Sequence, residues 1–330
     1  MDQLGAKIVV IGGGTGSFTL LQGLKQYATN ITALVNMADD GGSTGQLRDE
    51  FGVLPPGDVR QCLVALSASP KVRDLFNYRF DEGSFKGHAF GNLFLTALEK
   101  MTGNFGEAVE LASDVLKITG KVEPITLSNV QLCAEGADGK PVVGEYTIAH
   151  AEIADRPKVW LEPAADANPA AVKAIMEADM VVIAPGNLYG SLAPALVIEG
   201  IQDALQRTKA KCVYVANLVT KPGPTDGFTV VDFAGEIERL AGSRFLDYVV
   251  FNSDMPSREL MERYAHEGEY AVTFDTAELK KQHYKHRAVP ILAKSTWDGA
   301  RDSDPLAATR SLIRHDSDAV ARQLMRIYFA

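Results

Sequence analysis

The chain has 330 residues, of which 46% are hydrophobic and 23% are charged. This length and composition predict a folded protein with a large core and exclude an intrinsically disordered chain. The formal net charge of −9 argues against non-specific binding to nucleic acid or to an anionic membrane surface. An anionic ligand would therefore need a local site of backbone amides and a few basic side chains.

The cysteines and the hydropathy of the chain indicate its compartment. Cys62, Cys133 and Cys212 are odd in number, far apart and without the spacing of a metal site. We therefore expect reduced thiols in a cytoplasmic protein. No signal peptide precedes the first predicted strand and no apolar run is long enough to cross a bilayer, so we expect no membrane insertion.

The first pattern along the chain is an apolar strand followed by a glycine-rich turn. Residues Ile8 to Ile11 are all β-branched and apolar, which is typical of a strand buried on both faces of a parallel sheet. The turn consists of Gly12, Gly13, Gly14, Thr15 and Gly16. A helical pattern follows, and the free N–H groups and partial positive charge of a helix N-terminus suit a phosphate. We therefore predict an anion-binding turn at the carboxyl edge of the sheet.

This turn matches neither of the two common phosphate-binding motifs completely. A P-loop ends in Gly-Lys-Ser/Thr, and residues 12–18 contain no lysine. A dinucleotide fingerprint is Gly-x-Gly-x-x-Gly/Ala, and counting from Gly12 places Ser17 at its last position. Asp39 or Asp40, after the second predicted strand, could still act as the ribose-binding acid of such a fold. A nicotinamide-dependent dehydrogenase therefore remains an alternative.

A second polar, glycine-rich loop, residues 39–45, follows the predicted strand Ile31–Met37. Its candidate functional residues are Asp39, Asp40, Gly41 and Ser43. The carboxyl ends of neighbouring parallel strands meet at one edge of a sheet, so we expect this loop beside the first turn. The two carboxylates could hold Mg²⁺ on a diphosphate or accept the proton of a substrate hydroxyl. The alternative is a solvated loop with turn-forming residues.

Helical patterns dominate from about residue 58 to about residue 117. Asp58 is expected to be the N-cap of the first of these helices. His88 and Asn92 have helical spacing, which predicts that they lie on one face of a helix. Because imidazole titrates near neutral pH, His88 is a candidate general acid or base, and the alternative is a structural histidine.

The stretch from about residue 121 to about residue 163 is β-like, and Asp138-Gly139 predicts a hairpin turn within it. Strands and helices alternate after it. The later predicted strands are 180–184, 211–218, 247–252, 270–274 and 289–293. Repeated strand–loop–helix units predict an α/β fold with a doubly wound, mostly parallel, Rossmann-like sheet. We therefore predict one domain over residues 1–330 with a helical insertion at about 58–117 and an antiparallel β-hairpin insertion at about 121–163.

Several predicted strands end in residues that suit a ligand. These residues are Gly186, Asn187, Asn217 and Asn252. Asparagines at strand tips can hydrogen-bond a sugar or a base, and the alternative is that they cap helices and tie off turns. The charge run 280–287 is expected to be a solvated face. No Ser/His/Asp, Cys/His or zinc arrangement stands out in the sequence.

Seven blocks of the sequence together resemble one protein family. They are IGGGTG, ADDGGSTGQLRDEFGVLPPGDVRQCLVALS, GHAFGNLFLTAL, APGNLYGSLAPAL, ANLVTKPGPTDGF, VFNS and LIRHD. In this order, across essentially the whole chain, they resemble the YvcK/CofD family. The resemblance implies a Rossmann-like fold with a nucleotide-diphosphate site at the glycine loops.

The resemblance implies two alternative functions. The YvcK branch, often called gluconeogenesis factor, is linked to gluconeogenic growth, cell shape and cell-wall precursor supply, and it binds UDP-sugars such as UDP-N-acetylglucosamine. The CofD branch comprises 2-phospho-L-lactate transferases, which move a phospholactyl group from a nucleotide-activated donor to a deazaflavin. The sequence favours the YvcK branch. No cofactor is certain, and Mg²⁺ held by Asp39 and Asp40 remains an alternative. A homodimer and contacts with cell-wall enzymes are left open.

Two residues in the second half are similar to the YvcK nucleotide-sugar site. Tyr264 falls where the family motif has a tyrosine, and Arg314 is the arginine of the motif Arg-His-Asp. The implied roles are stacking of the tyrosine ring on uracil and binding of the diphosphate by the arginine fork. The alternatives are a half-buried tyrosine and an arginine that flanks a helix.

Overall fold

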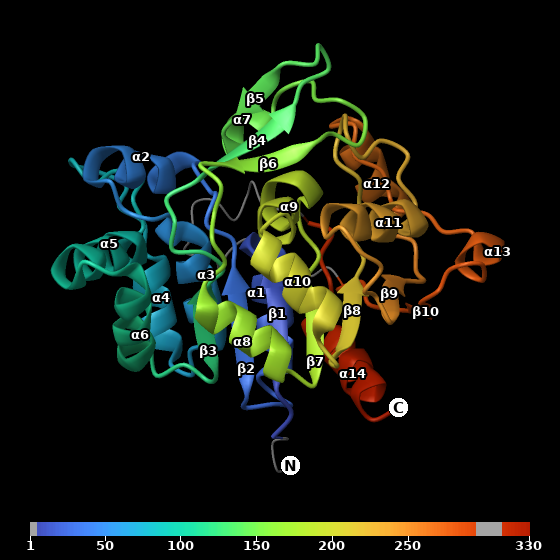
Figure 1. Ribbon diagram of the computed structural model, residues 1–330, viewed down its shortest axis with the longest axis horizontal. Helices are drawn as coiled ribbons and strands as arrows, with labels where there is room; N and C mark the ends of the chain where they lie inside the picture. Colours follow the sequence, from blue (N-terminus) through green and yellow to red (C-terminus); the bar gives the residue numbers. More distant parts are fainter. Residues whose placement is uncertain (1–4, 295–311) are drawn as a thin grey trace.

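The computed structural model describes residues 5–294 and 312–330 (Figure 1). Its centre is a seven-stranded parallel sheet in the order β10-β9-β8-β7-β1-β2-β3. The strands are β1 Ile8–Gly12, β2 Ile31–Val35, β3 Lys121–Pro124, β7 Met180–Ile183, β8 Lys211–Val215, β9 Tyr248–Asn252 and β10 Lys285–Val289. The chain moves outward from β1 to β3 and then returns to β7, so the strand order reverses between β1 and β7. The predicted doubly wound α/β fold is confirmed.

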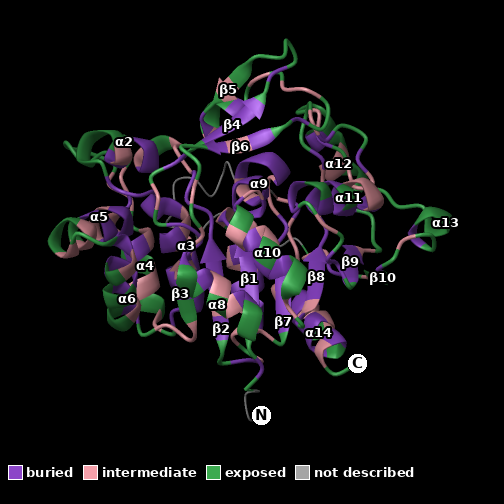
Figure 2. Cartoon of the chain, in the orientation of Figure 1, coloured by how far each residue is buried: buried purple, intermediate pink, exposed green. Residues whose placement is uncertain are grey.

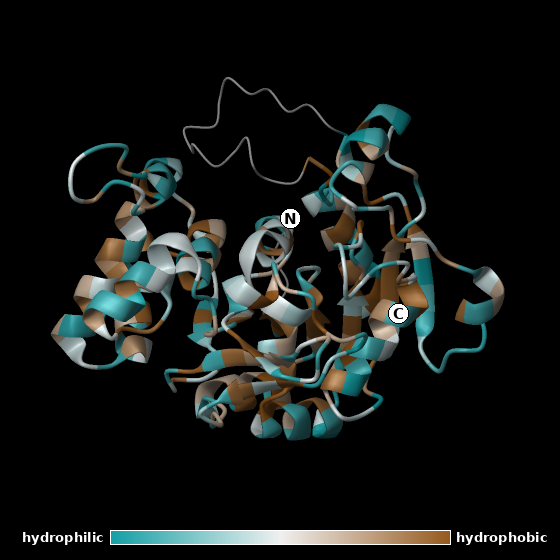
Figure 3. Ribbon diagram, turned by 90° about the horizontal axis from the view of Figure 1, so that it is seen from above, coloured by the Kyte–Doolittle hydropathy of each residue, from teal (hydrophilic) through white to brown (hydrophobic). Residues whose placement is uncertain are grey.

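The central strands are apolar because both of their faces are covered. Every residue of β1 and β7 is buried, whereas the edge strands β3 and β10 carry exposed residues (Figure 2). From above, hydrophobic residues concentrate inside and hydrophilic ones on the outer helices (Figure 3). Burial on both faces removes the period-2 alternation of a half-exposed strand, which is why these strands read as continuous apolar runs.

Helices cover both faces of the sheet. Helices α1, α3 and α14 pack together on one face, and α8 and α10 pack on the other (Figure 1). The helices are α1 Gly14–Leu24, α2 Gly42–Phe51, α3 Pro56–Leu66, α4 Pro70–Asn77, α5 Phe90–Thr102, α6 Phe105–Leu116, α7 Glu145–Ile148, α8 Pro169–Glu177, the π-helix η1 Leu188–Leu192, α9 Ala193–Leu196, α10 Glu199–Arg207, α11 Val230–Leu240, α12 Arg258–Ala265, α13 Thr276–Leu279 and α14 Ser317–Tyr328. Within residues 5–294 and 312–330, no helix is both long and apolar enough to cross a bilayer.

The β insertion is larger than a hairpin and begins later than predicted. Strands β4 Gln131–Glu135, β5 Pro141–Val143 and β6 Val159–Glu162 form an antiparallel sheet in the order β5-β4-β6. The predicted turn at Asp138-Gly139 does connect β4 to β5. Strand β3, at the start of the predicted insertion, instead pairs in parallel with β2. Four residues are too few for periodicity to distinguish an edge strand of the main sheet from part of a hairpin.

Three other predictions need correction. The loop predicted at 39–45 is partly helical, because α2 begins at Gly42. Residues 270–274 form only isolated bridges, and the strand predicted at 289–293 shares only Val289 with β10, which runs from Lys285 to Val289. The charge run 280–287 is therefore partly an edge strand. Its charged and exposed side chains lack the apolar signature of a central strand, as is usual at the edge of a sheet.

Candidate functional site

A cavity of about 370 Å³ lies at the carboxyl ends of β1, β7 and β8, where the strand order reverses. It brings together eight residues that the sequence singled out. They are Gly13, Gly14, Thr15, Gly16, Gly186, Asn187, Asn217 and Arg314. Such a reversal of strand order is where open α/β sheets bind their ligands. We therefore take this cavity as the candidate ligand site.

The glycine turn forms the N-terminus of α1 at the wall of this cavity. Gly13 is the N-cap, no side chain caps the helix, and its first turn contains no acidic residue. A Cβ atom on Gly16 would lie 1.7 Å from the carbonyl oxygen of Pro185, so only glycine allows α1 to approach the tip of β7 this closely. The N-terminal amides and the helix dipole of α1 therefore favour an anion in the cavity.

Basic side chains from two distant segments complete the lining. Arg314 comes from the segment before α14, and Lys221 comes from the loop after β8, where it forms an ion pair with Glu269. His315 also lines the cavity, and its Nε2 donates to the carbonyl oxygen of Ala216 at 3.0 Å. Burial lowers the pKa of His315 to about 4, so this imidazole is neutral at pH 7. The sequence did not single out Lys221 or His315.

The strand-tip asparagines also hold the backbone in place. Asn217 accepts from the N–H of Gly186 at 3.2 Å and donates to its carbonyl oxygen at 2.7 Å, which joins the tips of β7 and β8. Asn187 caps η1 by accepting from the N–H of Gly190 at 3.1 Å. Asn252 lies apart, in a neighbouring cavity of about 220 Å³, and accepts from the N–H of Ile291. All three asparagines therefore make hydrogen bonds to the backbone, and Asn187 and Asn217 hold the loops after β7 and β8.

Tyr264 does not line the cavity. It is 7% exposed and packs with Leu218 and Ile313 in a small apolar cluster. Its hydroxyl accepts from the N–H groups of Leu312 at 2.6 Å and Ile313 at 3.0 Å. Tyr264 therefore supports the backbone of the segment that carries Arg314 and does not line the candidate ligand cavity.

Asp39 and Asp40 have different partners and do not converge on one point. Both oxygens of Asp40 accept backbone N–H groups of α7, from Tyr146 at 2.8 Å and from Glu145 at 3.1 Å. Asp39 is turned inward and accepts from the N–H of Gly41 at 3.0 Å. A Mg²⁺ role for Asp39 and Asp40 stays a prediction. In the part of the chain that the structure describes, no three or more His, Cys, Asp or Glu side chains group as a metal site.

Asp58 is the acidic residue that lies directly at the glycine turn. It is not the predicted N-cap, because α3 begins at Pro56 with Pro55 as its N-cap. Its carboxylate accepts a hydrogen bond from the N–H of Gly14, and a Cβ on Gly13 would lie 2.1 Å from its Oδ2. Pro56 was the sequence signal for the true start of α3, because proline favours the first position of a helix and Pro56 precedes Asp58 by two residues.

Burial and neighbouring carboxylates raise the pKa of Asp58 to about 8. The neighbours are Asp39, whose pKa burial also raises, and Glu145, whose pKa is raised to about 7 by burial and by Asp39 and Asp40. These acidic groups join the two glycine loops to α7 of the β insertion. A proton on Asp58 or Glu145 reduces the repulsion that the three partly buried carboxylates would otherwise exert on one another.

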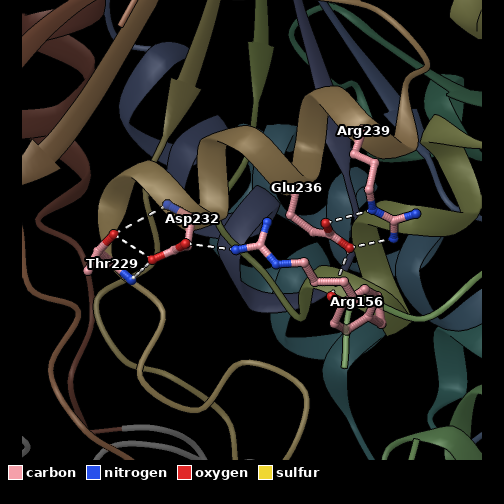
Figure 4. A network of polar contacts seen from close by, with 6 residues as sticks. Arg156, Thr229, Asp232, Glu236 and Arg239 are labelled. Atoms are coloured by element: carbon pink, nitrogen blue, oxygen red, sulfur yellow. Dashed lines mark hydrogen bonds and ion pairs between the residues drawn. The ribbon is translucent and has the colours of Figure 1, made fainter. Parts of the chain in front are cut away.

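The β insertion is fastened over the site on two sides. On one side Asp40 binds the N-terminus of α7. On the other side Arg156 donates to Asp232 of α11 at 2.8 Å (Figure 4). Arg239 of the same helix donates to the carbonyl oxygen of Pro157 at 2.8 Å. A small cavity of about 40 Å³ between the insertion and the strand tips shares Asn187, Asn217 and Lys221 with the main cavity. The insertion therefore reaches the candidate site.

Ser43, His88 and Asn92 lie together, but none of them lines the cavity. His88 is not on a helix face as predicted, because α5 begins at Phe90. Its ring instead contacts Ser43 at the start of α2, and Asn92 contacts the same hydroxyl. The two residues thus meet at Ser43 and not on one helix face.

Comparisons with known proteins agree on one family. The sequence model described as 2-phospho-L-lactate transferase CofD matches residues 8–292. A relative from Nostoc sp. is 50% identical over 277 residues, covering 82% of this chain and 60% of the relative. The gluconeogenesis factor of Bacillus subtilis is 43% identical over 278 residues, covering 83% of this chain and 87% of that protein.

A solved structure has the same fold. It is a crystal structure of a UPF0052 family member from Bacillus halodurans, with a TM-score of 0.88 and 34% identity. The match covers 98% of this chain and 99% of that one. The fold described above is therefore also the fold of that relative over nearly its whole length.

Asp58→Asn should change how stability depends on pH. The native carboxyl has a pKa near 8 and the unfolded one an ordinary pKa, so between about pH 4 and pH 8 the native state binds more protons. The free energy of unfolding of the wild type should therefore fall as pH rises through this window, by at most about 1.4 kcal/mol per pH unit. Urea unfolding should show that the variant gains stability relative to the wild type from pH 5 to pH 8. An equal difference at both pH values would contradict this, and Asp49→Asn controls for the lost charge.

Proposed function

Since the chain belongs to the family that unites the CofD transferases with the YvcK gluconeogenesis factors, we propose that it is a nucleotide-sugar-binding regulatory protein of the YvcK type. Its ligand is UDP-N-acetylglucosamine or a chemically close nucleotide sugar. The bound state would be passed to cell-wall or central-carbon enzymes, which links the protein to gluconeogenic growth, cell shape and cell-wall precursor supply. We also propose that it acts in the cytoplasm.

The observation that carries this proposal is the meeting of the α1 N-terminus with Arg314 and Lys221 around one cavity. A diphosphate needs N–H donors and cations at one place, and Arg314 offers a planar fork for two phosphate oxygens. The cavity volume of about 370 Å³ falls within the range of small-molecule sites, roughly 300–1,000 Å³. Because the protein as a whole carries a net charge of −9, an anionic ligand is expected to bind at this local group of cations and not elsewhere on the surface.

A binding role, and not catalysis, suits the lining of this cavity. His315 is neutral and already donates to Ala216, so it is not poised as a base beside a lining hydroxyl. Asn187 and Asn217 have amides that hold the backbone of the strand tips. A ligand held there would stabilise the junction of β7, β8 and the Arg314 segment. A regulatory protein requires a part of its structure whose stability depends on the ligand, and this junction would be such a part.

Arg314→Ala should weaken the binding of UDP-N-acetylglucosamine. Loss of a charge-assisted contact of about 1.5–3 kcal/mol corresponds to a rise in Kd of roughly 10- to 100-fold. Isothermal titration calorimetry of the wild type and the variant measures this rise. Arg326→Ala, which removes an exposed arginine of α14, is the matched control and should keep the wild-type Kd. No binding by the wild type, or an unchanged Kd for the Arg314 variant, would refute the site.

Tyr264→Phe distinguishes two roles of this tyrosine. If the ring stacked on uracil, phenylalanine would preserve binding, because both rings stack. If the hydroxyl instead holds the N–H groups of Leu312 and Ile313, its removal should displace Arg314 and raise the Kd for UDP-N-acetylglucosamine several-fold. We expect the second result, with Tyr270→Phe as the exposed control.

The combination Tyr264→Phe with Arg314→Ala completes this experiment. A residue that acts only through Arg314 adds no further loss once Arg314 is absent, so the two effects should not add. Additive losses in calorimetry would mean that Tyr264 contacts the ligand by a route of its own.

A phospholactyl transferase of the CofD type is the second candidate function, favoured by the family match over residues 8–292. A divalent cation on the donor diphosphate would then be held by Asp39 and Asp58 beside the glycine turn, and not by Asp40, whose oxygens cap α7. Positioning and charge neutralisation would supply most of the rate. Incubation with a nucleotide-activated phospholactate and a deazaflavin, followed by chromatography, should give product that Asp39→Asn abolishes. No turnover by the wild type would leave the regulator as the function.

A further inference from the structure

Ser43 and His88 form a hydrogen-bonded pair outside the nucleotide-sugar cavity. Ser43 is the second residue of α2, and His88 lies just before α5. The Oγ of Ser43 is 2.9 Å from Nδ1 of His88. The sequence separation of 45 residues means that only the fold brings the two side chains together.

The surrounding hydrogen bonds orient the side chains next to Ser43. Nε of Arg60 donates to Oδ1 of Asn92 at 2.9 Å, which fixes the orientation of the Asn92 amide. The Nδ2 of Asn92 then donates to Oγ of Ser43 at 3.3 Å. Ser43 has one proton and two acceptor lone pairs, so its oxygen accepts from Asn92 and can still donate its own proton to Nδ1 of His88. In the tautomer whose Nδ1 carries no proton, the imidazole accepts from the serine, as a general base beside a nucleophile does.

The support behind the pair is buried while the pair itself is accessible. Arg60 is 5% exposed and Asn92 is 3% exposed, and Arg60 is held further by Oδ1 of Asn77 at 2.5 Å. Ser43 and His88 are both half-buried. A small electrophile can thus reach the hydroxyl, whereas its orienting groups cannot move away.

The environment of Ser43 favours a phosphate as the reacting group. The hydroxyl lies in the first turn of α2, which contains no acidic residue and whose N-cap, Gly41, offers no side-chain cap. The first N–H groups of a helix lack intrahelical acceptors and stabilise anionic oxygens. Arg79 adds a cation beside His88, since its guanidinium donates to the carbonyl oxygen of Gly87 and its buried Nε has no hydrogen-bond partner among the described residues.

We propose that Ser43 and His88 are a nucleophile–base pair that takes a phosphoryl group from an activated phosphate ester. Oγ of Ser43 attacks phosphorus, an Oγ–P bond forms, and the bond from phosphorus to the leaving oxygen breaks. The serine proton passes to Nδ1 of His88 and from there to the leaving oxygen. His88 then takes the proton of a water or an acceptor hydroxyl whose oxygen attacks phosphorus. The bond from phosphorus to Oγ breaks, and His88 returns this proton to Oγ of Ser43. This inference goes beyond the nucleotide-sugar proposal and does not rest on it.

Reaction of the full chain with diisopropyl fluorophosphate tests the pair. The reagent transfers its phosphoryl group to an activated serine and releases fluoride, while the proton goes to the histidine. We expect peptide mass spectrometry to find the adduct on Ser43, and we expect Ser43→Ala to remove it. His88→Gln, which keeps a polar side chain but cannot accept the proton, should slow labelling by roughly 100-fold.

The wild-type digest contains its own control. Ser253 is exposed and its hydroxyl donates to a carboxylate oxygen of Asp254, so it is reachable and its hydrogen-bond partner among the described residues is a carboxylate, not a histidine. Labelling of Ser253 as fast as Ser43 would overturn the proposal without any variant. An unlabelled Ser43 in the folded wild type, or the same labelling rate in a folded His88→Gln protein, would also overturn it. None of these outcomes depends on whether UDP-N-acetylglucosamine binds.

Discussion

The close approach of α1 to the tip of β7 is the constraint on which the site depends. The carbonyl oxygen of Pro185 occupies the space in which a side chain at position 16 would begin. This contact places the N-terminus of α1 directly against the loops that follow β7 and β8. The strand order reverses at the same point, so helices diverge there and leave room for a ligand.

Charge is distributed on two sides of the glycine turn. Asp58 lies against the turn, close to Asp39, and burial keeps its carboxyl protonated to a higher pH than usual. Arg314 and Lys221 lie on the cavity side. A neutral acid near the turn does not repel an anion, whereas an ionised one would. For the nucleotide-sugar ligand proposed above, the protonation of Asp58 would therefore be linked to how well the cavity accepts its phosphates.

Parts of the chain that are distant in sequence close the site. The hydroxyl of Tyr264 is bonded to Ile313, 49 residues away, and Asp40 is bonded to the N–H of Tyr146, 106 residues away. The first contact holds the segment that carries Arg314, and the second holds the β insertion near the glycine loops. Both depend on a side-chain group meeting backbone N–H groups, which no local pattern indicates.

The sequence by itself determined the buried strands, the glycine turn and the place of the candidate site, because apolar runs and glycine positions express local requirements of a parallel sheet. It also singled out Arg314 through its motif. Only the tertiary structure decided which polar groups meet: Asp58 with the glycine turn, Tyr264 with the backbone, and Ser43 with His88. The physical reason is that hydrogen bonds are short and directional, so they depend on the final positions of elements that the sequence lists far apart.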